Sequence, residues 1–253
     1  MRQDDRAPFV QALCRARTRA YPAGEYVSQE SFMRAGEIRA LAEQAGIAPG
    51  VSVLDLCCGI AGPGRFITRE LGCDYLGVDS SASAVEIARE RSRGLACRFV
   101  VAHVPPVPPG TFDVVLLLET MLAFSDKAAL LKSIAGALPP GGRFAFTVEE
   151  GAPLTGPERE RMPDADTVWL VSLDEIHRLL DRAGLVVRRE EDVSSAHRET
   201  AGALTDAFAA DAAAIAADLG RAALDELLAA HRLWSEWLGT GRVRKFAVVA
   251  ERV

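Results

Sequence analysis

Residues 51–66 read Val51-Ser52-Val53-Leu54-Asp55-Leu56-Cys57-Cys58-Gly59-Ile60-Ala61-Gly62-Pro63-Gly64-Arg65-Phe66. An apolar run with one acidic residue leads into a glycine-rich turn, and a helical pattern follows the turn. This order predicts a buried strand, a tight turn and a helix, an arrangement that lets a nucleoside lie against bare backbone. A second acidic residue, Asp79, closes the next apolar run 24 residues after Asp55. A carboxylate at the end of that second strand is placed to accept hydrogen bonds from ribose hydroxyls.

The alternation of apolar runs and helical patterns continues along the chain. The sequence pattern, apolar in most of these segments, predicts seven strands, at 51–56, 74–78, 97–101, 112–118, 143–149, 185–191 and 243–250. Helical patterns occupy 8–20, 28–45, 62–71, 81–92, 126–138, 172–183 and 195–238, whereas 150–168 is predicted to be a polar loop. Because four strand–helix units follow one another, we expect an α/β fold with a parallel, doubly wound sheet.

The chain divides into three parts in this interpretation. The N-terminal segment, 1–44, is helical and carries tyrosines in a Gly/Pro loop, so we expect it to close over the site as a lid. Residues 45–194 and 240–253 form the α/β core. Residues 195–239 form a helical cap inserted before the last strand, since about 45 residues of helix are far more than a connection within a sheet needs.

Composition and charge narrow the classes of partner. The formal net charge of −6 argues against a nucleic-acid duplex, because phosphate binding favours a basic surface. No run approaches the roughly 18 apolar residues of a membrane span. The first 20 residues carry several charges and no apolar core, so they do not resemble a secretory signal. We therefore expect a small-molecule substrate and no nucleic-acid or membrane partner, and the sequence leaves both a monomer and a homodimer open.

The five cysteines indicate the cellular setting. They lie at positions 14, 57, 58, 73 and 97, without C-x-x-C spacing and in odd number. A reduced, cytoplasmic location fits this pattern best. No cluster of His, Asp and Glu has the spacing of metal ligands, so no metal is expected.

Two classes of nucleotide cofactor compete for the glycine turn. Residues 59–64 match G-x-G-x-x-G loosely, with Ala61 in the place of the second glycine. A dinucleotide site needs a helix N-terminus open to a pyrophosphate, and Asp55, four residues before Gly59, would repel that anion. The same carboxylate would attract a cationic cofactor with a free amino group. Asp55 therefore favours a cationic nucleoside cofactor over NAD(P).

Four motifs carry a resemblance to a known family. They are VLDLCCGIAGPGRF at 53–66, YLGVDSS at 75–81, FDVVLLLET at 112–120 and LPPGGRFAFT at 138–147. In order and spacing this series resembles class I S-adenosylmethionine-dependent methyltransferases over about residues 45–150. The N-terminal loop and the helical insertion are similar, less specifically, to small-molecule methyltransferases of natural-product and sterol type. The resemblance implies a Rossmann-like, seven-stranded, mostly parallel sheet with the last strand antiparallel and helices on both faces.

The resemblance also implies a site for S-adenosylmethionine. Asp55 would orient the methionine amino group, and Asp79 would bind the ribose hydroxyls with Ser80 beside the adenine. Leu118 and Glu119 would line the methyl-donor pocket. The turn backbone would pass under the methionine and ribose, at Cys57, Gly59, Ala61, Gly62 and Gly64. Cys57 and Ala61 stand where the family usually has glycine, and both are small enough to keep the turn.

The remaining candidates are less firmly placed by their motifs. His103 occupies a position where an acidic residue often meets the adenine amino group, so Ala102 or a backbone carbonyl would take that role instead. Tyr26, in the N-terminal loop, would close over the cofactor. Glu119 is a candidate general base whose pKa an apolar surround would raise, or alternatively a helix cap or a cofactor contact. His197 is the second candidate base, with a solvent-facing position as the simpler alternative.

Methyl transfer to an oxygen, nitrogen or carbon atom of a small molecule, in natural-product metabolism, is the function that these features favour, with S-adenosylhomocysteine as the coproduct. A protein of the same fold that binds S-adenosylmethionine while catalysing a cyclisation, or that does not methylate, stays open because fold does not determine function. An NAD(P)-dependent oxidoreductase is a further alternative. Against it stand Asp55 and the absence of a Tyr-x-x-x-Lys pair.

Overall fold

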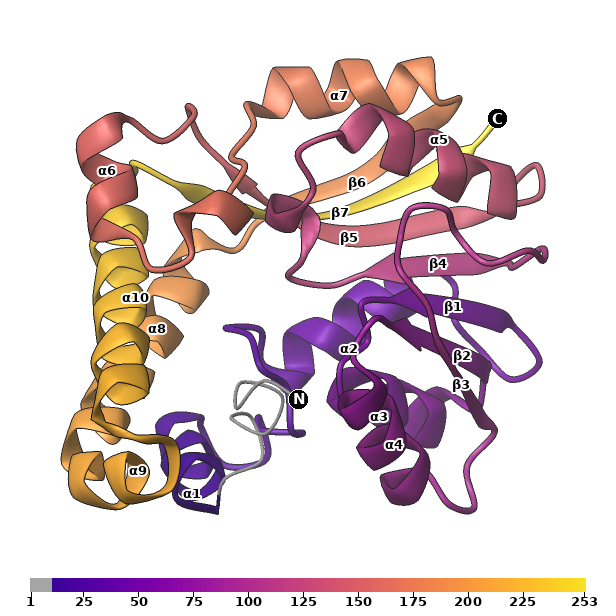
Figure 1. Ribbon diagram of the computed structural model, residues 1–253. Helices are drawn as coiled ribbons and strands as arrows, with labels where there is room; N and C mark the ends of the chain where they lie inside the picture. The colour runs from indigo at the N-terminus through magenta and orange to yellow at the C-terminus, as the bar shows by residue number, and fades with distance from the viewer. Residues whose placement is uncertain (1–10) are drawn as a thin grey trace.

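The computed structural model describes residues 11–253 and contains a seven-stranded sheet covered by helices (Figure 1). The strand order is β3-β2-β1-β4-β5-β7-β6. Strands β1 to β5 pair in parallel, and β7 is antiparallel to both of its neighbours, β5 and β6. The expected Rossmann-like sheet is thus confirmed. The strands are β1 (Ser52–Leu56), β2 (Asp74–Asp79), β3 (Cys97–Val101), β4 (Val114–Leu117), β5 (Arg143–Glu150), β6 (Leu185–Asp192) and β7 (Arg244–Arg252).

Helices cover both faces of the sheet. One face packs against α2 (Ala35–Gln44), α3 (Gly62–Leu71) and α4 (Ala82–Arg91), and the other against α5 (Lys127–Ala137) and α7 (Leu173–Arg182). Strand β4 shows why its sequence is apolar throughout. Val115 and Leu117 belong to the core under α5, and the alternating Val114 and Leu116 belong to the core under α2.

The helical insertion forms a second layer beyond the sheet edge. It consists of α8 (Ser194–Ala210), α9 (Ala212–Leu219) and α10 (Arg221–Thr240), and α1 (Gln11–Ala20) packs against α8 and α9. These helices share a separate apolar cluster that includes the fully buried Phe208 and Leu224. In Figure 1 they stand to one side of the sheet, with α10 running alongside α8. No helix within residues 11–253 is long and apolar enough to span a membrane.

Three predicted elements differ from the structure. The helix expected at 28–45 begins only at Ala35, because Arg34 is an extended N-cap and Glu37 closes a capping box at that point. The expected loop at 150–168 contains a short helix, α6 (Gly156–Arg161), and a 3-10 turn at Ala165–Thr167. A further 3-10 turn, Met121–Ala123, follows β4. The helical region of the cap is divided into three helices by breaks at Asp211 and Gly220. Positions 8–10 of the helix predicted at 8–20 lie outside the described residues.

Candidate functional site

The glycine turn keeps its shape without all of its glycines. Cys57 and Ala61 have φ of 59° and 56°, and Gly59 has φ of 52°. The left-handed region costs a residue with a side chain roughly 1–2 kcal/mol. Cys57 and Ala61 therefore hold the conformation that glycine would adopt, at a modest cost that the surrounding fold offsets.

Asp79 ties the end of β2 to this turn. Its Oδ2 accepts a hydrogen bond from the Gly59 N–H at 2.8 Å, and its Oδ1 accepts one from the Ser81 N–H at 2.9 Å. Each carboxylate oxygen keeps a further lone pair. The side chain is therefore fixed in place with acceptor capacity that remains for a ligand.

Asp55 is the buried acid of the site. It is 4% exposed, and its Oδ2 accepts a hydrogen bond from the Tyr75 hydroxyl at 2.5 Å. Burial raises its pKa to about 7. Gly64 supports this contact, because a Cβ there would lie 2.1 Å from Cζ of the Tyr75 ring. Gly64 thus makes room for Tyr75 and does not itself line the cavity described next.

A cavity of about 270 Å³, here named the turn cavity, lies above the glycine turn. The segment Ser28–Met33 lies on one side and the ends of β1, β2 and β4 lie on the other. The candidate residues that line it are Asp55, Cys57, Gly59, Gly62, Asp79, Leu118 and Glu119. The structure therefore brings these seven candidate residues together around one cavity, and their role in binding a cofactor stays a prediction.

Other candidates lie outside the lining of the turn cavity. Tyr26 packs against Tyr21 with ring centroids 5.4 Å apart, so it belongs to the cluster under the cap helices. Ser80 and His103 are exposed, and Ala102 donates its N–H to the Asp79 carbonyl at 2.9 Å. Ala61 is fully buried at the N-cap of α3.

The N-terminal segment closes on the turn through a different set of residues. Gln29, which is 1% exposed, accepts the Val27 N–H and donates to the Met33 carbonyl, which folds the segment into a compact loop. This loop approaches the turn so closely that a Cβ on Gly62 would lie 2.4 Å from the Ser28 carbonyl oxygen. The backbone of 28–33 is thus the part of the N-terminal segment that covers the turn cavity.

Replacing Gly62 tests this close contact. Gly62→Ala is expected to lower the free energy of unfolding by about 1–3 kcal/mol, because the Ser28 backbone has to move. Gly136→Ala is the matched control, since a Cβ there meets nothing within 4 Å inside α5, and it should leave stability unchanged or raise it by up to about 1 kcal/mol. Urea unfolding of both variants measures the difference. If both substitutions change the free energy of unfolding equally, the close contact between Gly62 and the Ser28 backbone is contradicted.

A second cavity, of about 280 Å³, lies between the sheet edge and the cap and is here named the cap cavity. It shares Glu30, Ser31 and Glu119 with the turn cavity, so the two cavities meet at these residues. Its apolar walls come mainly from the N-terminal loop, the 162–168 loop and the cap, and include Phe32, Leu122, Met162, Val168, Leu204, Trp234 and Leu238.

Glu119 stands at this junction in an ion-pair network. Its Oε1 lies 2.8 Å from Lys245 Nζ and accepts a hydrogen bond from the Thr147 hydroxyl at 2.9 Å. Its backbone is left-handed, with φ of 61°. Burial by itself would raise the pKa of the Glu119 carboxyl group. The contacts with Lys245, His197 and Thr147 outweigh this effect and hold the pKa at about 2. The expectation of a base with a raised pKa is therefore wrong, because a buried cation is adjacent.

Lys245 and Glu149 are candidate-site residues that the sequence analysis missed. Lys245 is 2% exposed and is paired with both Glu119 and Glu149, which faces it across the β5–β7 ladder. Both side chains line the cap cavity. The sequence gives no clear signal for this pair, because Glu149 and Lys245 lie next to other charged residues, Glu150 and Arg244, at the ends of β5 and β7.

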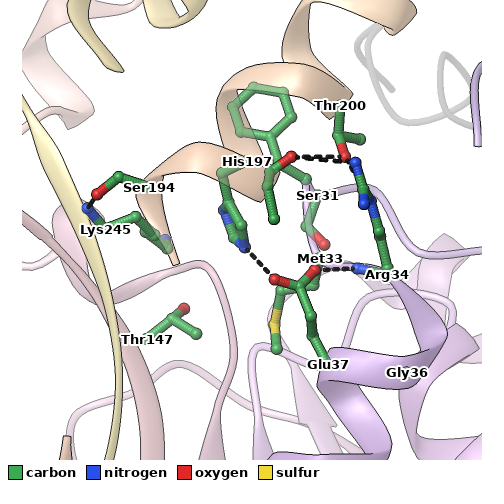
Figure 2. A network of polar contacts seen from close by, with 12 residues as sticks. Ser31, Met33, Arg34, Gly36, Glu37, Thr147, Ser194, His197, Thr200 and Lys245 are labelled. Atoms are coloured by element: carbon green, nitrogen blue, oxygen red, sulfur yellow. Dashed lines mark hydrogen bonds and ion pairs between the residues drawn. The ribbon is translucent and has the colours of Figure 1, made fainter. Parts of the chain in front are cut away.

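His197 lies at the same junction and does not face solvent. It is fully buried, and its Nδ1 lies 3.8 Å from Glu119 Oε2. Its Nε2 lies 3.6 Å from Glu37 Oε1 (Figure 2). Burial lowers its pKa to about 4. His231 lines the cap cavity too, and its Nδ1 is 2.8 Å from the Leu227 carbonyl oxygen. Within residues 11–253, no group of three or more His, Cys, Asp and Glu side chains is arranged to hold a metal ion.

Comparison with known proteins agrees with this fold. A family model described as "Methyltransferase domain" matches residues 15–190. Phosphoethanolamine N-methyltransferase 3 of Arabidopsis thaliana is 33% identical over 130 residues, which are 49% of this chain and 26% of that enzyme. Methyltransferase GfsG of Streptomyces halstedii is 29% identical over 181 residues, 66% of this chain and 64% of that protein. The match thus spans about a quarter of the plant enzyme and less than two thirds of GfsG.

Solved structures show the same fold. The cyclopropane synthase MmaA2 from Mycobacterium tuberculosis superposes with a TM-score of 0.82 at 12% identity, covering 100% of this chain and 99% of that one. The [4+2]-cyclase SpnF superposes with a TM-score of 0.72 at 22% identity, covering 91% of this chain and 85% of that one. By the family match and this sheet topology, the chain belongs to the class I S-adenosylmethionine-dependent methyltransferase family.

Proposed function

We propose that this protein transfers the methyl group of S-adenosylmethionine to an oxygen, nitrogen or carbon atom of a small molecule. The observation that carries the proposal is the meeting of the turn cavity and the cap cavity at Glu30, Ser31 and Glu119. A donor in the first cavity and an acceptor in the second would face each other at that boundary. Two adjoining cavities of similar volume fit a reaction between two bound molecules better than binding of one.

The residues of the turn cavity fit the cofactor. A Cβ built on Gly59 meets nothing within 4 Å, so the backbone there is open to a ligand. Asp79 has spare acceptor capacity for ribose hydroxyls beside that glycine. Asp55 offers a buried carboxyl group, whose negative charge a ligand's amino group would stabilise. The same carboxylates disfavour the pyrophosphate of NAD(P).

The chain would act mainly by binding and alignment. When bound, S-adenosylmethionine supplies an electrophilic methyl group on a sulfonium and is converted to S-adenosylhomocysteine. Asp55 and Asp79 would hold the two ends of the donor, and the 28–33 loop would exclude water from it. The apolar walls of the cap cavity would orient the acceptor so that its reacting atom points towards Ser31 and Glu119.

The cap cavity indicates the kind of acceptor. Its aromatic and aliphatic walls favour a largely apolar body, and its floor of Glu119, Glu149 and Lys245 favours one polar end. Several relatives methylate small molecules according to their names, such as sterol 24-C-methyltransferase of Eremothecium gossypii, 32% identical over 131 residues. Natural-product metabolism is the setting we propose. A cytoplasmic location and a homodimer remain predictions.

Donor binding should depend on pH through Asp55. Because its pKa is about 7 without a ligand, the carboxyl group is largely protonated below that pH and loses its attraction for the cofactor's amino group. The affinity for S-adenosylhomocysteine is expected to rise by up to about tenfold per pH unit below pH 7 and to level off above pH 7. Titration calorimetry across this range measures the effect. Asp55→Asn should remove this dependence of the affinity on pH. If the dependence is unchanged in the variant, a group other than Asp55 causes it.

Methyl transfer itself is tested with S-[methyl-³H]adenosylmethionine and a panel of small apolar hydroxyl, amine and activated-carbon acceptors. Label in a product, dependent on the protein, supports the proposal. Tight binding of S-adenosylhomocysteine with no labelled product across the panel, together with turnover of a polyene to a cyclic isomer, would favour a cyclase instead. The SpnF structure shows that this fold occurs in such a protein.

A further inference from the structure

His197 connects the cap cavity with a third cavity. This cavity, of about 410 Å³ and here named the rear cavity, lies between α2 and the start of α8. Its lining includes Glu37 and the exposed residues Ala40, Asp192 and Ser195, so it reaches solvent. Because His197 lines both cavities, its imidazole ring is the boundary between the proposed acceptor site and this opening.

Hydrogen bonds do not fix the His197 ring. Both ring nitrogens are buried and have no hydrogen-bond partner among residues 11–253, although carboxylates lie 3.6 Å and 3.8 Å away. Buried polar atoms are normally paired, and a pair of unpaired ones in a native fold requires an explanation. At neutral pH the ring is uncharged, so one nitrogen carries a proton and the other a lone pair.

Glu37 is held so that one oxygen faces this ring. Its Oε2 accepts the Arg34 N–H at 2.7 Å, and its Oε1 is directed towards His197 Nε2 (Figure 2). The Arg34 guanidinium group turns away, to the Thr200 hydroxyl, the Ala196 carbonyl and Glu199. Burial raises the pKa of Glu37 to about 7. Glu119 and Glu25 add to the increase, and the Arg34 N–H and guanidinium oppose it.

We propose that His197 and Glu37 form a proton relay that deprotonates a hydroxyl acceptor in the cap cavity and releases the proton through the rear cavity. The relay rests on the proposed methyl transfer. The acceptor O–H bond breaks as Nδ1 takes the proton, while Nε2 gives its own proton to Glu37. The oxygen forms the new bond to the methyl carbon, and the electron pair of the broken C–S bond stays on sulfur. The net release is one proton, which passes from Glu37 to water.

The groups around the ring suit this assignment. Glu119 cannot be the base, because its pKa of about 2 keeps it ionised and ion-paired, but it faces Nδ1 and would stabilise the proton that arrives there. Burial lowers the pKa of His197, and Lys245 and Arg34 add to this effect against the opposite influence of Glu119; the low pKa helps the ring to pass the proton on. An amine acceptor needs no such path for its proton. The relay therefore implies that the acceptor carries a hydroxyl group.

The relay predicts a tautomer switch. When Glu37 is ionised, Nε2 keeps the ring proton and Nδ1 presents its lone pair to the acceptor. When Glu37 is protonated, it donates to Nε2, and the ring proton moves to Nδ1 beside Glu119. In ¹⁵N-imidazole NMR, with the signal assigned by its loss in His197→Gln, we expect the wild-type ring to change tautomer near pH 7.

Glu37→Gln is the decisive variant. Its amide oxygen can still accept the Arg34 N–H, so the cap of α2 is kept, while its NH₂ group donates to Nε2 and holds the ring proton on Nδ1 at every pH. Glu25→Gln is the control, because Glu25 accepts the Gly36 N–H of the same helix at 2.8 Å, and it should keep the switch. A switch that persists in Glu37→Gln, or no switch in the wild type, overturns the relay.

A hydroxyl acceptor found in the methylation panel adds a second readout. Glu37→Gln should then lower kcat by about 100-fold with little change in KM and should remove the rise in kcat with pH near 7. Full activity of this variant overturns the relay. If the wild type methylates a hydroxyl without a tautomer switch, the relay alone fails. If it does not bind S-adenosylhomocysteine, the proposed function fails whatever the NMR shows.

Discussion

Lys245→Met is expected to lower the free energy of unfolding by about 3–5 kcal/mol at neutral pH. The substitution leaves Glu119 and Glu149 without the cation that lies between them, and both carboxylates are largely buried. Uncompensated buried charge is among the most destabilising changes that a single substitution can make. The loss should be smaller in acid, where protonation of the carboxyl groups removes that charge.

The controls separate charge from packing. Lys132→Met removes an exposed lysine on α5 and should change stability by less than about 0.5 kcal/mol. Lys245→Met combined with Glu149→Gln removes one charge of each sign and should recover part of the loss. Urea unfolding with an unchanged m-value provides the measurement. A Lys245→Met protein as stable as Lys132→Met would show that the network does not support the fold.

Asp79→Ala is expected to lower the affinity for S-adenosylhomocysteine by about 100-fold or more. The substitution removes the proposed acceptor of two ribose hydroxyl groups, and hydrogen bonds to a charged group contribute roughly 1.5–3 kcal/mol each. It also leaves the Gly59 and Ser81 N–H groups without their acceptor, which loosens the turn. Titration calorimetry measures the affinity, and thermal unfolding measures the accompanying loss of stability.

Asp113→Ala is the matched control for this loss. Asp113 also accepts two hydrogen bonds, from the Ser52 N–H at 2.8 Å and from the Ser52 hydroxyl at 2.6 Å. It precedes β4, at the edge of the sheet opposite the turn cavity. Removing it should destabilise the fold without changing the affinity. Equal affinity losses in both variants would mean that Asp79 acts through stability alone.

The sheet could be predicted because its signal is local. Most strands are apolar runs bounded by turn residues, and the predicted strand limits lie within about two residues of those observed. The acid at the end of β1 and the acid at the end of β2 follow from the same pattern. Segment 28–34 has helical spacing in sequence, yet the buried Gln29 amide folds it into a loop, and that choice depends on tertiary contacts.

The polar network at the cavity boundary could not be predicted in the same way. Glu149 meets Lys245 only through the antiparallel β5–β7 register, and Glu37 meets His197 only because α2 and α8 both lie against β7. These partners are 96 and 160 residues apart in the chain. Their spacing carries no periodic signal, so the sequence indicated Glu119 and His197 individually but not the charges that determine their pKa values.

Titration calorimetry of the wild-type protein with S-adenosylhomocysteine and with NADH tests the central claim most directly. The geometry of Asp55, Asp79 and the open backbone at Gly59 predicts that one S-adenosylhomocysteine binds per chain at pH 8, where Asp55 is ionised. It predicts no measurable binding of NADH under the same conditions. Binding of NADH without binding of S-adenosylhomocysteine would contradict the account.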